Sequence, residues 1–171
     1  MSARLLVAGV GNELMGDDGF GIVAAERCAD AGLGPDVRIV QSGIAGIGLV
    51  QDLMDGYDAV IVLDAIDHGS DPGTIHVIEL VTPAIETMSD HDRWELLTDM
   101  HYTIPSRVMI LARALGVLPA KSYLVGCQPG VMELGQGLSG PVAAAVDEAV
   151  ARTRELVEAA RRAAAPAAGA A

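Results

Sequence analysis

Four short and nearly continuous apolar runs divide the chain, at Leu5–Val10, Val37–Val40, Ala59–Leu63 and Tyr123–Val125. Runs of this length that are rich in Val, Ile and Leu are typical of strands buried on both faces of a parallel sheet. Amphipathic segments with helical spacing lie between the runs, at residues 20–28, 47–54 and 104–115. This alternation predicts a doubly wound α/β fold with three layers, α/β/α.

A fifth strand, at residues 74–80, is expected to run antiparallel to the others. Only residues 66–73 separate it from the preceding strand, whereas a parallel return needs a crossover of about a dozen residues or more. Asp71-Pro72-Gly73 supplies the turn, because proline fixes φ and glycine accepts a positive φ. The predicted sheet is therefore mixed and five-stranded, with four parallel strands.

The 171 residues are enough for one domain with a single core. We expect one α/β domain over residues 1–162, with a last helix from about Pro141 and a disordered alanine-rich tail at residues 163–171. Residues 82–100 are polar and acidic, and they predict a long loop with one helical turn.

Composition limits the classes of partner. A formal net charge of −12 opposes nucleic acid, which is bound by clustered Lys and Arg. No apolar run reaches the roughly 18 residues of a membrane helix, and no signal peptide precedes the first strand. We therefore expect a cytoplasmic protein without membrane insertion. Cys28 and Cys127 have no CxxC spacing and are expected to be buried as small apolar side chains.

The first strand leads into Gly9-Val10-Gly11-Asn12-Glu13-Leu14-Met15-Gly16-Asp17-Asp18-Gly19. The segment matches neither G-x-G-x-x-G nor the Walker pattern, so it lacks the parts of a phosphate-binding loop. One aspartate is expected to cap the following helix. The other is spare and lies in a loop at the carboxyl edge of the sheet, where ligand sites of such folds form.

Asp64 directly follows an apolar strand, and burying its carboxylate without a partner would cost several kcal/mol. His101 closes the polar segment and is also expected at the carboxyl edge. Together with Asp18 these side chains would form a three-ligand site that suits nickel, zinc or cadmium. Asp67 and His68 are reserve ligands. No G-x-S-x-G elbow and no Cys–His pairing occurs, which leaves attack by water, activated by a carboxylate or a metal.

The glycine-rich segment from Gly9 through Gly21, the strand end Val62-Leu63-Asp64-Ala65, and His101 resemble the motifs of hydrogenase maturation proteases over residues 5–157. The resemblance implies an endopeptidase that removes the C-terminal extension of a [NiFe]-hydrogenase large-subunit precursor. It also implies that Asp18, Asp64 and His101 contact nickel, and that this nickel is supplied by the precursor and serves as a recognition element. Zinc or cadmium would substitute for it in crystals.

Asn12, Gly43 and Gly46 are expected to contact substrate. Many relatives carry aspartate and threonine in the loop after the second strand, where this chain has Gln41 and Ile44. Two other functions stay open, a non-hydrolytic nickel-dependent chaperone of the large subunit and a metal-dependent hydrolase of small molecules. Replacement of Asp17 is expected to affect processing much less than replacement of Asp18.

Overall fold

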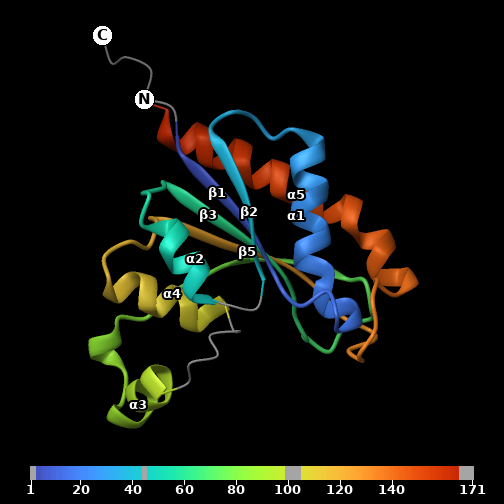
Figure 1. The fold of residues 1–171 in the computed structure, drawn as a ribbon. Coiled ribbons are helices and arrows are strands. Elements are labelled where there is room, and N and C mark those ends of the chain that lie inside the picture. The colour runs from blue at the N-terminus through green and yellow to red at the C-terminus, as the bar shows by residue number, and fades with distance from the viewer. Residues whose placement is uncertain (1–2, 44–45, 99–104, 166–171) are drawn as a thin grey trace.

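The computed structural model describes residues 3–43, 46–98 and 105–165. Its sheet has five strands in the order β2-β1-β3-β5-β4 (Figure 1). All neighbours are parallel except β4 and β5, which are antiparallel. This confirms the predicted mixed sheet, including the reversed fifth strand. The strands are β1 Leu5–Val10, β2 Val37–Gly43, β3 Ala59–Ala65, β4 Ile75–Glu79 and β5 Lys121–Cys127.

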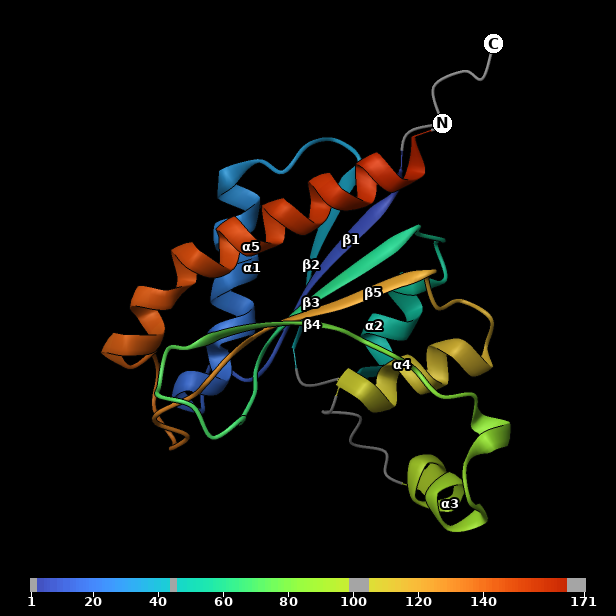
Figure 2. The same cartoon turned by 180° about the vertical axis from the view of Figure 1, so that it is seen from behind.

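Helices cover both faces of the sheet (Figure 2). α1 (Phe20–Ala31) and α5 (Gly140–Ala164) pack on one face, and α2 (Gly46–Leu53) and α4 (Pro105–Ala114) pack on the other. Alternate residues of β1 enter the two cores, as a strand with a period of two requires: Leu5 and Val7 face α1 and α5, whereas Leu6 and Ala8 face α2 and α4. None of the described helices is long and apolar enough to span a membrane.

The segment predicted as a long loop contains two helices, a 3-10 turn η2 (Ile85–Thr87) and α3 (Asp90–Thr98). The prediction was wrong because it missed a local cap. The Ser89 hydroxyl accepts a hydrogen bond from the Asp92 backbone N–H (3.1 Å) and donates one to the Asp92 carboxylate (2.7 Å). Such an exchange across three residues starts a helix without any apolar periodicity.

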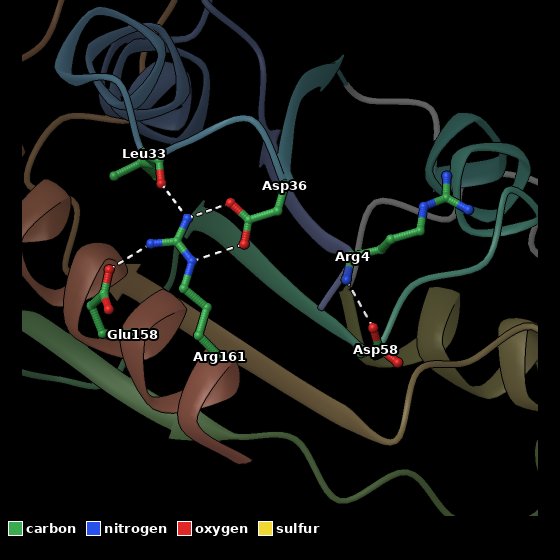
Figure 3. A network of polar contacts seen from close by, with 6 residues as sticks. All are labelled: Arg4, Leu33, Asp36, Asp58, Glu158 and Arg161. Carbon is green, nitrogen blue, oxygen red and sulfur yellow. Dashed lines mark hydrogen bonds and ion pairs between the residues drawn. The ribbon is translucent and has the colours of Figure 1, made fainter. Parts of the chain in front are cut away.

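The C-terminal helix is tied to the loop before β2 by Arg161 (Figure 3). Its guanidinium donates to both carboxylate oxygens of Asp36 (2.8 and 2.5 Å) and to the carbonyl of Leu33 (2.6 Å). This contact lowers the pKa of Asp36 and secures α5 near its end. α5 continues through Ala163 and Ala164, into the tail predicted as disordered, and residues 166–171 lie outside the described residues.

The start of α1 lies directly on the backbone of the central strands. A Cβ at Gly21 would overlap the carbonyl oxygens of Val10 and Leu63, at the ends of β1 and β3. Only glycine permits this approach. It holds η1 (Gly16–Gly19), which immediately precedes α1, against the carboxyl edge of the sheet.

Gly21→Ala is therefore expected to lower the free energy of unfolding by about 1–3 kcal/mol, because the added methyl group meets two backbone atoms that no side-chain rotation moves aside. Gly48→Ala is the matched control. A Cβ at Gly48 in α2 meets no atom within 4 Å, and alanine there is expected to raise stability by about 0.5–1 kcal/mol. Urea titration of both variants measures the difference, and equal stability of the two would refute the close contact.

Candidate active site at the carboxyl edge of the sheet

The loop after β1 turns back on itself and places η1 over the strand ends. Gly11 has a φ of +137°, a conformation in which L side chains are strained, and a Cβ there would also overlap the carbonyl oxygen of Asp18. The Asn12 backbone N–H donates to that carbonyl (3.2 Å). The Asn12 side chain in turn accepts a hydrogen bond from the Leu14 N–H (3.0 Å). The loop thus brings Asp18 back beside β1.

Asp18 and Asp64 share this edge. Asp64 is 6% exposed at the end of β3, which packs against η1. Burial, followed by the negative charge of Asp18, raises the pKa of Asp64 well above its ordinary value, and the Ala65 N–H opposes the rise only in part. Burial also raises the pKa of Asp18, against a hydrogen bond from the Asn12 N–H. No positive charge of a described residue contributes to either shift, and a bound cation would supply one.

Asp17, in contrast, is part of the framework. Its carboxylate is fully buried and accepts four hydrogen bonds, from the backbone N–H groups of Gly130 (2.8 Å), Val131 (2.7 Å) and Ser139 (2.6 Å) and from the Ser139 hydroxyl (2.9 Å). Burial alone would raise its pKa, but these donors lower it. Ser139 is the N-cap residue of α5, so Asp17 joins η1 to the distant start of α5. The prediction that one of the two aspartates caps the following helix was wrong, because neither η1 nor α1 has a side-chain cap hydrogen bond.

The structure describes only some of the other residues that were predicted for the site. His101 lies outside the described residues, as does Ile44. Among the described residues, no group of three or more His, Cys, Asp or Glu side chains is placed to hold a metal ion. The carboxylate of Asp67 accepts from the Gly69 N–H (2.9 Å) and from the Gln128 amide (3.0 Å). Asp67 is thus used by its own turn, which argues against it as a reserve ligand.

A groove of about 530 Å³ runs beside η1. Of the three predicted substrate contacts, Asn12 and Gly43 line it, whereas Gly46 is buried at the start of α2 and does not. Gln41 lines the groove too, and its side-chain amide donates to the Glu26 carboxylate (3.0 Å). The groove adjoins the Asp18 loop, but neither Asp18 nor Asp64 lines it. The other lining residues are Gly11, Glu13, Leu14, Gly16, Gly19, Ile22, Val23, Gln136, Gly137 and Leu138.

The sequence of this chain is similar to those of known proteins. Residues 22–155 match the hydrogenase maturation protease family. The chain is 36% identical over 160 residues to the hydrogenase expression/formation protein HupD of Rhodobacter capsulatus, an alignment that covers 90% of this chain and 71% of that protein. The chain belongs to the hydrogenase maturation protease family.

Solved structures agree with this membership. The fold is similar to that of the hydrogenase maturating endopeptidase HybD from E. coli, with a TM-score of 0.73, 28% identity, and coverage of 91% of this chain and 93% of that one. It is also similar to a hydrogenase 2 maturation peptidase from a Thaumarchaeota archaeon, with a TM-score of 0.67, 33% identity, and coverage of 90% and 97%. The α/β fold predicted from the strand pattern is thus the fold of this protease family.

The segment after β5, residues 128–139, is the part of this protease's candidate site that the sequence prediction missed. It supplies the donors to Asp17, and its residues Gln136, Gly137 and Leu138 line the groove. The sequence did contain a signal. Pro129-Gly130 starts a glycine-rich stretch without helical or strand periodicity that is long for a connection in a compact domain, and such loops are often functional.

Asp17→Ala is expected to lower the free energy of unfolding by at least about 3 kcal/mol, because it leaves several donors of residues 130–139 without an acceptor. For stability, Asp17 is therefore the sensitive position, whereas the expectation from the sequence concerned the effect of its replacement on processing. Asp18→Ala, the neighbouring control, should cost about 1 kcal/mol or less. Thermal and urea unfolding of the two variants compare them, and a smaller loss for Asp17→Ala than for Asp18→Ala would contradict the assignment.

Asp64 makes stability depend on pH in a defined direction. Because the folded-state pKa of Asp64 is raised, folding is opposed as pH rises above the unfolded-state value of about 3.9. Asp64→Asn removes this opposition, so the free energy of unfolding of the variant relative to wild type should increase between about pH 4 and pH 7. Urea titrations across this range test it. Asp30→Asn, at an exposed position on α1, is the control. If the free energy of unfolding of Asp64→Asn changed with pH in parallel with that of wild type, the raised pKa assigned to Asp64 would be refuted.

Proposed function

We propose that this protein is the endopeptidase that removes the C-terminal extension of a nickel-loaded [NiFe]-hydrogenase large-subunit precursor, with the substrate's nickel as the recognition element. The observation that carries the proposal is the pairing of Asp18 and Asp64 at the carboxyl edge. Burial raises the pKa values of both carboxyl groups, and the charge of Asp18 adds to the rise at Asp64; a divalent cation would stabilise the ionised forms that burial disfavours. Family membership supports the hydrogenase precursor as the source of that cation.

The donor set suits the proposed metal. Two carboxylate oxygens from Asp18 and Asp64, together with an imidazole from His101, form a set of intermediate hardness that accepts nickel. Three ligands from this chain leave positions for ligands that the precursor itself supplies. A metal held by both proteins fixes the precursor relative to the protease, and such orientation is worth up to several kcal/mol of the barrier.

The hydrolytic step itself is simple. Water adds to the scissile carbonyl carbon, the C–N bond breaks, and a proton passes to the leaving amine. Two routes to activation of the water are consistent with the residues present, a carboxylate acting as general base or polarisation by the metal. Binding of the cation requires Asp64 to be ionised, so its affinity should rise with pH through the raised pKa of that group.

Cleavage should require the metal-loaded precursor. Nickel-loaded and nickel-free precursor incubated with the purified protein should give, respectively, a shortened product and no product on a gel, because without the metal nothing bridges the two proteins. Zinc added to the protease alone should not rescue the nickel-free precursor. Equal cleavage of both precursors would overturn the metal-reading mechanism, and binding without shortening would favour a nickel-dependent chaperone.

Each of Asp18→Ala, Asp64→Ala and His101→Ala should then reduce processing by more than about 100-fold, since each removes a ligand to the bridging metal. Far-ultraviolet circular dichroism should show a retained fold, at least for the Asp18 and Asp64 variants. Asp30→Ala, which removes an exposed carboxylate of α1, should process at the wild-type rate. Full activity in any of the three ligand variants would exclude that residue from the site.

A further inference from the structure

Two loops near the candidate site present large apolar side chains to solvent. Leu14 is 54% exposed in the loop after β1, and Val131, Met132 and Leu134 are 47%, 46% and 86% exposed in the loop after β5. Single exposed apolar residues are ordinary on protein surfaces, whereas several gathered together mark an interaction site. These four residues, here termed the two-loop apolar patch, are gathered by backbone pairing.

The backbone of the two loops is hydrogen-bonded at three points. The Gly135 N–H donates to the Leu14 carbonyl (2.9 Å), the Gly16 N–H to the Gly135 carbonyl (3.0 Å) and the Asp17 N–H to the Val131 carbonyl (2.9 Å). Figures 1 and 2 both show the two loops side by side beyond the carboxyl ends of the strands. The patch is therefore one surface assembled from segments more than a hundred positions apart in the chain.

Hydrogen bonds to a buried side chain hold the second loop of the patch in place. The Asp17 carboxylate fixes the Gly130 and Val131 amides at one end of the second loop and Ser139 at the other. Surfaces that are ordered before binding lose little conformational entropy when a partner docks. Both loops also line the 530 Å³ groove, the first through Leu14 and the second through Leu138. A partner seated on the patch would thus lie next to the groove and to the loop that carries Asp18.

Charge indicates the chemistry of that partner. The chain has no Lys or Arg between Arg4 and Arg27, or between Lys121 and Arg152, so neither loop carries a positive side chain. Glu13 and Glu133 flank the patch, and among the described residues no Lys or Arg forms an ion pair with either. The complementary surface is apolar with a basic rim. A second copy of this chain fits poorly, because it would bring like charges together.

We propose that the two-loop apolar patch is the docking surface for the body of the protein substrate, through an apolar area rimmed by Lys or Arg beside its cleavage segment. This inference rests on the proposed function, since the substrate is taken to be the large-subunit precursor. It adds a second area of contact to the metal. Binding of the folded body at the patch would leave the extension free to enter the neighbouring groove.

Met132→Ser/Leu134→Ser tests the assignment with nickel-loaded precursor. The double variant should raise KM about tenfold, as expected for loss of central apolar contacts, with kcat within about twofold of wild type, because Asp18 and Asp64 are untouched. Leu115→Ser, a leucine 58% exposed just beyond α4, is the matched control and should leave both constants unchanged. Glu133→Lys should raise KM several-fold at low salt, with a smaller effect at high salt.

The outcomes separate the two proposals. If the wild-type protein neither binds nor shortens the precursor, both are overturned. If it shortens the precursor and the double variant has an unchanged KM, only the docking surface is overturned. Light scattering measures the oligomeric state of both proteins. If the wild type were a dimer and the double variant a monomer, a second copy of the chain would occupy the patch, and the assignment would be overturned.

Discussion

The first turn of α1 packs on the carboxyl ends of β1 and β3 with no side chain between them, because Gly21 has no Cβ. Everything at the candidate site depends on this contact. It brings η1 down onto the sheet, and η1 carries Asp18 toward Asp64, which closes the apolar strand β3. A larger residue at position 21 would lift the helix from the strands and separate the two carboxyl groups.

The segment after β5 holds the other loops of this edge together. Asp17 binds it to the loop after β1 through four hydrogen bonds. Gln128, itself 6% exposed, accepts from the His68 N–H (2.7 Å) and the Ser70 N–H (3.2 Å) and so binds it to the loop after β3. Hydrogen bonds thus join three connections that are remote in sequence into one rim, as expected where a fold positions the side chains of a functional site.

The aspartates at this edge show how the surroundings of identical side chains shift their pKa values in opposite directions. Asp17 is surrounded by N–H and O–H donors that stabilise its negative charge, so its pKa is lowered even though it is fully buried. Asp18 and Asp64 have few donors, so burial raises their pKa values, and the negative charge of Asp18 adds to the rise at Asp64. Under the proposed function, these two carboxyl groups would become ligands to the metal of the substrate, which would stabilise their ionised forms.

The sequence by itself determined the sheet, because the evidence of a buried strand is local: Ala59–Leu63 is apolar throughout, and the short connection after it forces β4 to run antiparallel. It also indicated Asp64, since a carboxylate at the end of a buried strand needs a partner wherever the fold places it, and Asp18, as one of two adjacent aspartates in a loop at the same edge. Only the tertiary structure decided the role of Asp17, whose partners lie more than a hundred residues away. It also decided which exposed apolar residues share a surface, because the pairing of Leu14 with Gly135 depends on how two loops meet in space and leaves no periodic pattern in either segment.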